Sequence, residues 1–228
     1  MEIFNKKKFL SLCKAQYCGK EVICFKNINS TNDHAIKLED KALKLNNCSN
    51  FFNKLNGAII ISETQKSGRG RSYKKWFSPP GGLWFTLILI SRINPYDVKK
   101  INLIMAISIL ESLKNIFGID LKVKWPNDLY YNQKKLCGVL SELNSYDEVS
   151  FLNVGAGLNA NISFNNSPDS ENSLAGNAIS LKEILKQETG REEILADIIK
   201  NFEINYEGYM QSCDLKSIFL KIENSILI

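Results

Sequence analysis

The sequence has little that could hold a structural metal or cross-link the chain. It contains one histidine, His34, and its six cysteines, at positions 13, 18, 24, 48, 137 and 213, include no C-x-x-C pair. Zinc and iron–sulfur sites need clustered Cys and His ligands, so neither is expected. Because the spacing of the cysteines suggests no disulfide framework, they indicate reduced, mostly buried thiols in a cytoplasmic protein.

Long apolar segments are also missing, and charge is not concentrated. The N-terminus, MEIFNKKKFLSLCKAQ, is basic, but its apolar run is too short for a signal peptide, and no segment approaches the length of a membrane span. We therefore expect no membrane partner. The 29 basic and 24 acidic residues leave a net charge of +5, which suits anionic small molecules or an acidic protein partner better than DNA.

The common nucleotide-binding fingerprints are absent or incomplete. No G-x-x-x-x-G-K-[ST] string occurs, which excludes a Walker P-loop. Gly155, Gly157 and Ala160 match G-x-G-x-x-A, but the NISFNNSPDS that follows does not open a helix, and Glu171 comes too early to bind a ribose. We interpret these glycines as positions where a ligand or another backbone approaches a strand closely.

The chain does contain short β-branched or aromatic runs that interleave with longer helical periods. Strands are predicted at 21–28, 57–65, 82–91, 121–125, 134–143 and 148–157, and helices at 30–47, from Pro95 to Gly118, and over most of the last third. The run 82–91 is apolar on both faces, which favours a central strand. Ser30 and Asp33 stand at capping-box spacing at the start of the first long helix.

These elements predict one domain. The chain has 44% hydrophobic residues, no repeats and no strongly biased linker, so a single domain over 1–228 is expected, with 1–20 as an N-terminal extension. Because strands and helices interleave without strict βαβ alternation, the predicted fold is α+β, with a mixed β-sheet packed against helices.

Four polar segments stand out, and each has an ordinary interpretation beside a functional one. GRGRSYKKW (68–76) is either a solvated basic loop that touches nucleic acid non-specifically or a mobile clamp for phosphate. STN (30–32) is a helix cap or a set of N–H groups for an anionic or carbonyl ligand. KWPND (124–128) is typical of a turn, and the lysines of KKLCGVL (134–140) protect a strand edge or place one amine in a cleft.

In this order, STN, TQKSGRGRSYKKWFSPPGGLW, KWPNDLYYNQKKLCGVLSE and NVGAGLNANIS resemble the catalytic domain of biotin protein ligases, from about residue 22 to the end of the chain. The resemblance implies a fold like that of class II aminoacyl-tRNA synthetases and biotin–lipoate ligases. It also implies a two-step reaction. Biotin and MgATP give biotinyl-5′-AMP and pyrophosphate, and a lysine of a biotin carboxyl carrier domain is then acylated. ATP and Mg²⁺ are the implied cofactors, with Mg²⁺ entering on the phosphates near Asp128 and not held by protein side chains alone.

The resemblance assigns roles to individual residues. Lys135 is expected to contact the biotin carboxylate and the α-phosphate, Arg69 to close over the intermediate, and Asp128 to orient metal-bound phosphate or to take the proton of the incoming lysine. The implied biotin-binding residues are Ser30, Thr31, Asn32, Gln65, Gly68, Arg69, Arg71, Trp76, Lys135, Gly138, Leu140, Gly155 and Gly157. The implied ATP-binding residues are Arg69, Arg71, Asn127, Lys135 and Asn159.

Residues 66–75 are predicted to form a lid that is mobile without ligand and ordered with it, because biotinyl-5′-AMP is a mixed anhydride that water destroys. Lys74 and Lys75 are expected to be the solvated charges of this loop. The family string commonly continues with a glycine and an arginine where this chain has Tyr73 and Lys74, which bears on the flexibility of the lid and on how tightly it retains the intermediate.

Two further departures bear on partners. The N-terminal stretch is too short for the winged helix–turn–helix of repressor-type members, so no DNA partner is expected, and the chain stops about where the small C-terminal β-barrel domain of typical members begins. A homodimer is the favoured assembly. The alternatives are a lipoate or octanoate ligase of the same fold, a biotin or biotinyl-AMP binding protein that does not transfer, and a nucleic-acid-binding module.

Overall fold

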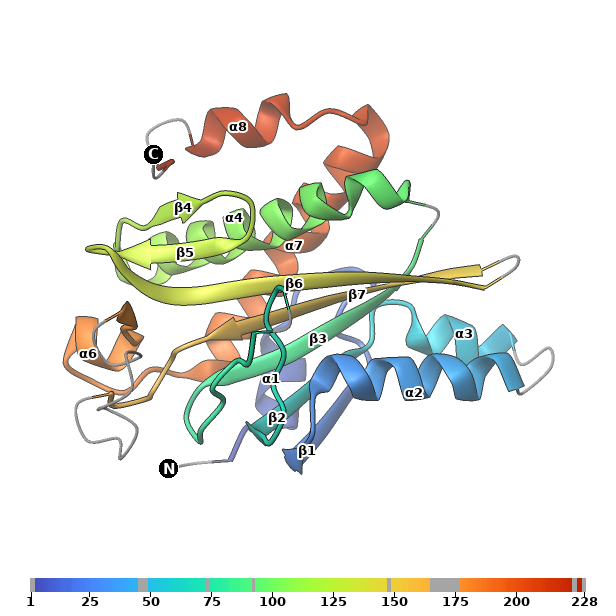
Figure 1. The fold of residues 1–228 in the computed structure, drawn as a ribbon, viewed down its shortest axis with the longest axis horizontal. Coiled ribbons are helices and arrows are strands. Elements are labelled where there is room, and N and C mark those ends of the chain that lie inside the picture. Colours follow the sequence, from blue (N-terminus) through green and yellow to red (C-terminus); the bar gives the residue numbers. More distant parts are fainter. Residues whose placement is uncertain are drawn as a thin grey trace.

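A mixed sheet forms the centre of the molecule. The computed structural model describes residues 3–44, 49–72, 74–91, 93–146, 149–164, 177–222 and 225–226. Within these residues, seven strands lie in the order β1-β2-β3-β7-β6-β5-β4 (Figure 1). β1 and β2 pair in parallel, and the other neighbouring strands pair antiparallel. The predicted α+β fold with a mixed sheet is confirmed.

The elements follow the predicted pattern with three additions. The strands are β1 Val22–Ile28, β2 Ile59–Gln65, β3 Leu83–Ile90, β4 Lys122–Lys124, β5 Asp128–Tyr131, β6 Lys134–Tyr146 and β7 Val149–Leu158. The helices are α1 Lys6–Leu12, α2 Thr31–Lys44, α3 Ser49–Leu55, α4 Val98–Phe117, α6 Leu181–Leu185, α7 Arg191–Ser212 and α8 Lys216–Ile222, with a 3₁₀ turn, η1, at Pro95–Asp97. The short elements α1, α3 and β5 were not predicted, since residues 1–20 were expected only as an N-terminal extension. The end of the helix predicted at 30–47 lies outside the described residues.

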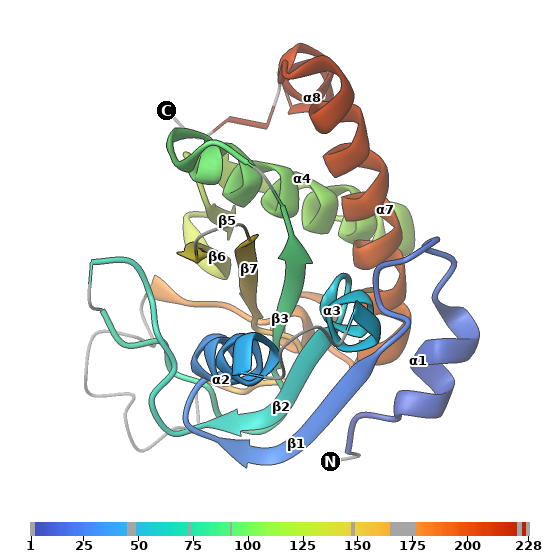
Figure 2. The same cartoon turned by 90° about the vertical axis from the view of Figure 1, so that its right-hand side faces the viewer.

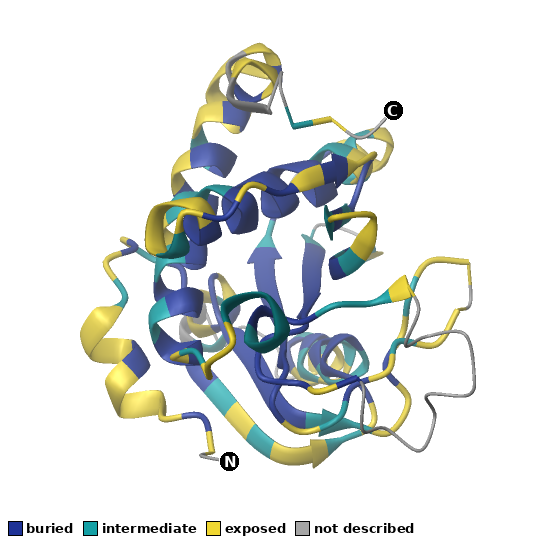
Figure 3. Cartoon of the chain, turned by 90° about the vertical axis from the view of Figure 1, so that its left-hand side faces the viewer, coloured by how far each residue is buried: buried dark blue, intermediate teal, exposed yellow. Residues whose placement is uncertain are grey.

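One face of the sheet packs on the main core. In β3, the side chains of Leu83, Phe85, Leu87 and Leu89 alternate toward this core, which α4 and α7 complete. Figure 3 shows α4 and the central strands mostly in dark blue, whereas α1 is largely exposed. The predicted stop of α4 is confirmed, since Gly118 follows it with φ 68°, a left-handed conformation that favours glycine. No helix in the described ranges is long and apolar enough to cross a membrane.

The opposite face is divided between helices and a cavity. α2 and α3 cover one part of it, where Ile60, Ile88 and Phe151 pack with Ala35 and Ala42. Figure 2 shows α2 end-on beside β2, well apart from α4 and α7. Toward the first turn of α2, the strands of this face carry glycine and polar residues, and the cavity described below lies there.

The N-terminal segment joins the main core. Phe9 is fully buried there, and the backbone N–H of Phe4 donates to Glu63 Oε1 at 2.7 Å. The carboxylate of Glu203 on α7 accepts the N–H groups of Tyr17 at 3.0 Å and Cys18 at 2.8 Å. Residues 4–18 are therefore fixed to β2 and α7 by burial and by hydrogen bonds to carboxylates.

Candidate functional site

A cavity of about 450 Å³ opens on the α2 side of the sheet. It brings together segments from α2, the loop after β2, the turn before β5, and strands β6 and β7. Of the residues predicted for the site, the following line it: Ser30, Thr31, Asn32, Gln65, Arg69, Arg71, Trp76, Asn127, Asp128, Lys135, Gly138, Leu140, Gly155, Gly157 and Asn159. Gly68 is not among the lining residues. It is buried at the base of the loop, where its carbonyl accepts from the N–H of Trp76 at 2.8 Å.

The floor of the cavity consists of glycines because two larger side chains lie directly on it. A Cβ at Gly155 would stand 2.2 Å from Asn32 Oδ1, and one at Gly157 would stand 2.4 Å from Trp76 Nε1. Gly138, paired with Gly157 across the sheet, leaves 3.0 Å between such a Cβ and the Trp76 ring. Each of these glycines lets a side chain approach the strand backbone closely. The sequence predicted close approach at Gly155 and Gly157, but by a ligand or another backbone; in the structure the approaching groups are the Asn32 and Trp76 side chains.

The first turn of α2 forms a hydrogen-bonded wall with its neighbours. Ser30 Oγ accepts from the N–H of Asp33 at 3.4 Å, so this half of the capping pattern is present. Gln65 Oε1 accepts from the N–H of Thr31 at 2.8 Å and lies 3.2 Å from its hydroxyl. Gln65 Nε2 donates to Ser78 Oγ at 2.9 Å, which fixes the amide orientation.

Thr86 is a residue of this wall that the sequence analysis missed. It is fully buried on β3, with its hydroxyl 2.8 Å from Thr31 Oγ1 and 2.5 Å from Asn32 Oδ1. A buried hydroxyl must find hydrogen-bonding partners. A lone threonine inside the apolar run LWFTLILI was therefore a signal that polar side chains pack on this strand.

Lys135 is the central cation of the site. Its Nζ lies 2.7 Å from Asp128 Oδ2 and 5.1 Å from the centre of the Trp76 ring. Asp128 Oδ1 accepts from Asn127 Nδ2 at 2.9 Å, and Asn127 Oδ1 accepts from Arg71 Nη1 at 2.6 Å. A continuous polar chain therefore runs from the loop arginine through the Asn-Asp pair to the lysine.

Asn159 supports the backbone around this lysine. Its Nδ2 donates to the carbonyls of Lys135 at 3.3 Å and Ile179 at 3.1 Å, and its N–H donates to Leu136 O at 3.0 Å. These bonds connect the end of β7 to the start of β6, where the lysine is carried. Asn159 also borders the cavity.

The basic loop lies between β2 and β6 (Figure 1, teal), and its residues 69–72, 74 and 75 line the cavity. Arg69 makes a bidentate pair with Glu142, with Nη1–Oε1 at 2.7 Å and Nη2–Oε2 at 2.6 Å. Its Nε lies 2.8 Å from Asp33 Oδ1. The predicted mobility of residues 66–75 stays a prediction, and Tyr73 lies outside the described residues. Lys74 and Lys75 are exposed, as expected, and both border the cavity.

Five cations border the cavity in the described part of the chain, against the single carboxylate of Asp128; they are Arg69, Arg71, Lys74, Lys75 and Lys135. Because Arg69 is bound by Glu142 and Asp33, the positive charge that suits a ligand with phosphates comes mainly from the other four cations. The indole N–H of Trp76 is buried and has no partner among the described residues, so it is a donor available to a ligand at the floor.

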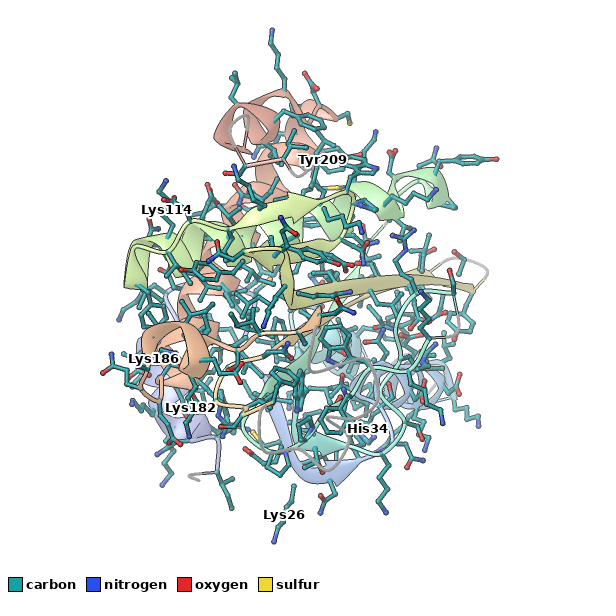
Figure 4. All side chains as sticks on the ribbon, turned by 60° about the vertical axis from the view of Figure 1, so that its left-hand side comes forward. Lys26, His34, Lys114, Lys182, Lys186 and Tyr209 are labelled. Atoms are coloured by element: carbon teal, nitrogen blue, oxygen red, sulfur yellow. The ribbon has the colours of Figure 1, made fainter. Side chains whose placement is uncertain are left out.

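A protein-bound metal centre is not formed by the described residues. They contain no group of three or more His, Cys, Asp or Glu side chains that could hold an ion. His34 (Figure 4) packs edge-on against Phe25, with ring centroids 4.5 Å apart. Asp128 is the carboxylate at the cavity, and one carboxylate fits a Mg²⁺ ion that is held mainly by phosphates.

Comparisons with known proteins agree with this geometry. The chain is 30% identical over 199 residues to the bifunctional ligase/repressor BirA of Bacillus subtilis and 28% identical over 215 residues to biotin–protein ligase 2 of Arabidopsis thaliana. The matches cover 86% and 91% of this chain but only 57% and 59% of those proteins. The biotin protein ligase of Aquifex aeolicus, solved with biotin and ATP, has a TM-score of 0.71 and 31% identity, covering 91% of this chain and 79% of that one.

The match to a family model covers the part of the chain that contains the cavity. Residues 25–159, more than half of the 228, match the biotin/lipoate A/B protein ligase family. That range includes the wall formed by α2, the loop, Lys135 and the glycine floor. The chain belongs to the biotin/lipoate A/B protein ligase family.

Proposed function

We propose that this protein joins biotin to ATP as biotinyl-5′-AMP and then transfers the biotinyl group to a lysine of a biotin carboxyl carrier domain. The observation that carries the proposal is the position of Lys135, whose ammonium group lies between the Trp76 ring on the glycine floor and the polar chain that leads to Arg71. Support comes from the Aquifex aeolicus ligase, which is solved with biotin and ATP. The chain spans under two thirds of the length of the two curated relatives named above.

In the first step, a carboxylate oxygen of biotin attacks the α-phosphorus, and pyrophosphate leaves. Both reactants are anionic, so the site must offset their repulsion and hold them in line. We assign Lys135 to contact both the carboxylate and the α-phosphate, and Arg71 to contact the nucleotide phosphates. The glycine floor and Trp76 accept the apolar chain of biotin, while Thr31, Asn32 and Gln65 offer polar contacts to its ring.

In the second step, the amine of the acceptor lysine attacks the acyl carbon, and AMP leaves. The amine must lose a proton, and Asp128 is the carboxylate that lines the cavity. One of its oxygens pairs with Lys135 and the other accepts from Asn127, which fixes its orientation. We assign Asp128 as proton acceptor once Lys135 has turned to the phosphate.

The cofactor and partner assignments extend the proposal. Mg²⁺ would arrive with the ATP phosphates and neutralise their charge, with Asp128 as the nearby carboxylate. The proposed partners are biotin, the carrier domain and a second copy of the chain, with no DNA or membrane partner. A cytoplasmic location fits cysteines that are free thiols in the described residues. The prediction that these thiols are mostly buried is wrong, because Cys18 and Cys137 are buried but Cys24 and Cys213 are exposed.

Pyrophosphate release tests the proposal directly. The protein is incubated with MgATP and either biotin or lipoate, and a biotin carboxyl carrier domain is then added. Release that depends on biotin, followed by labelling of the carrier, is expected. No release with biotin contradicts the proposal, and release with lipoate alone selects the lipoate ligase. Adenylate formation without labelling selects a protein that binds and activates biotin but does not transfer it.

A further inference from the structure

Glu142 is an acidic residue on the cavity side of β6 with no role in the reaction described above. It lies two residues beyond Leu140, which lines the cavity, and alternate residues of a strand share a face. Its carboxylate binds Arg69 through both oxygens and also accepts from Asn32 Nδ2 at 2.7 Å. One side chain therefore connects the loop, the sheet and the first turn of α2.

The three nitrogens of the Arg69 guanidinium group are all engaged. Nη1 and Nη2 bind Glu142 and Nε binds Asp33, at 2.6–2.8 Å. A single exposed ion pair contributes little to stability. A bidentate arginine–carboxylate pair is stronger and more specific in geometry, and a second carboxylate on the same arginine restricts the side chain further. The side chains of Arg69 and Glu142 are 37% and 26% exposed, so water screens the pair only in part.

Arg71 differs in its surroundings, although it is only two residues away. Its partner is the neutral amide oxygen of Asn127, at 2.6 Å. Arg69 faces two carboxylates, so the local sum of charges there is −1, which repels a phosphate, whereas Arg71 keeps its positive charge uncompensated by its partner. Arg69 is therefore suited to anchoring the loop, and Arg71 to binding a phosphate.

We infer that Glu142 is a positioning residue, which holds residues 66–72 of the loop over the cavity through Arg69, with Asp33 as the second anchor, and leaves Arg71 to meet the phosphates. This inference rests on the proposed function, because the purpose of the held loop is to keep water from the mixed anhydride. Loss of Glu142 releases the loop while the chemical groups around Lys135 stay in place. The adenylate then forms but escapes or hydrolyses before transfer.

Glu142→Gln tests the inference, because glutamine retains the size of the side chain and an oxygen for Asn32 but loses the charge. We expect at least a tenfold shorter lifetime of the bound adenylate and a higher ratio of pyrophosphate released to biotin transferred. The initial rate of adenylation should change less than threefold. Asp33→Asn, which removes a single contact, should shift both quantities in the same direction by a smaller factor.

Limited trypsin digestion separates this inference from the proposed function, because it needs neither biotin nor ATP. Cleavage after Arg71 should be about tenfold faster in Glu142→Gln than in the unaltered protein. In a Glu142→Gln and Arg69→Gln double variant, cleavage there should be no faster than in Arg69→Gln alone, since both act through one contact. Additive effects of the two substitutions contradict a role through Arg69.

Glu188→Gln is the matched control. It breaks a comparable exposed pair, Lys182 Nζ–Glu188 Oε1 at 2.9 Å, near α6 (Figure 4 labels Lys182), and should leave digestion and adenylate lifetime unchanged. Adenylate lifetime and loop cleavage in Glu142→Gln that match the unaltered protein overturn the inference. Failure of the unaltered protein to form an adenylate overturns the proposed function instead, while the digestion result still decides whether Glu142 holds the loop.

Discussion

The two faces of the central strands differ in what covers them: one packs into the main core, and the other borders the cavity. On the face toward α4 and α7, every second residue of β3 is a large apolar side chain with an exposure of 0 or 1%, and the space is filled. On the face toward α2, the central strands carry Thr86, Gly155, Gly157 and Gly138, and part of the space remains as a cavity. The difference shows that the cavity lies where the strands carry glycines and a threonine instead of large apolar side chains.

This division separates stability from binding. Filling one face with apolar atoms stabilises the fold by removing them from water. Glycines on the other face bury little apolar area, but they let Asn32 and Trp76 lie against the backbone. Substitutions on the face toward α4 and α7 should therefore change mainly stability, and substitutions on the face toward α2 should change mainly binding.

The largest effect is expected at Lys135. Replacing it with alanine removes the cation that we propose contacts the biotin carboxylate and the α-phosphate, so biotin-dependent pyrophosphate release should fall by roughly 10²–10³-fold or more. The side chain is partly exposed, so the unfolding midpoint should stay nearly unchanged. Lys134→Ala, at the exposed neighbouring position, is the control and should retain near-normal adenylation. Retained adenylation in Lys135→Ala removes this residue from its proposed role.

A pair of substitutions on the two faces tests the contrast itself. Gly157→Ala places a methyl group 2.4 Å from Trp76 Nε1, which must move, so biotin affinity should fall at least tenfold. Leu87→Ala on the filled face should cost about 2–5 kcal/mol of unfolding free energy and leave biotin affinity unchanged in the folded fraction. Calorimetric titration and denaturant unfolding measure the two quantities.

Gly208→Ala on α7 is the control for the glycine substitution. A Cβ there meets nothing within 4 Å, and alanine favours a helix, so stability should rise by up to about 1 kcal/mol with no change in binding. If Gly157→Ala lowers stability by several kcal/mol and spares binding, the cavity floor is a structural feature and not a binding surface.

The sequence predicted the strands of the core better than the cavity on the α2 side, because a buried strand follows from the local pattern of apolar residues. The run 82–91 is apolar on both faces, and β3 is indeed central and buried. The short strand β5 escaped prediction because Asp128–Tyr131 gains its pairing from β4 and β6 and has no pattern of its own. Glu142 was missed for a similar reason, since its partner Arg69 is 73 residues away and only the fold brings them together.

A smaller effect is expected at Thr86, which lies on the face of β3 toward α2, between neighbours on the strand that point into the main core. Thr86→Val keeps the shape but removes a hydroxyl that lies within hydrogen-bonding distance of Thr31 and Asn32. The loss should destabilise the protein by about 1–3 kcal/mol and raise the KM for biotin several-fold, because the wall residues lose their alignment. Thr64→Val, at the half-buried end of β2, is the control for binding, because its hydroxyl donates to Lys26 O and Asn27 Oδ1 on β1 and not to the wall; the KM should stay unchanged. An unaltered KM in Thr86→Val excludes the hydroxyl from positioning the wall.

The smallest effect concerns the outer side of α2, away from the cavity. Burial against Phe25 lowers the pKa of His34 from 6.5, and the nearby Lys37 acts in the same direction. The folded protein therefore binds this proton more weakly than the unfolded chain, so the contribution of His34 to stability is present above pH 6.5 and is lost as the pH falls below it. Because His34 is the single histidine, its NMR titration can be assigned without a variant. A midpoint below that measured in urea is expected. A midpoint at or above the urea value would contradict the burial of His34 between α2 and Phe25 of β1.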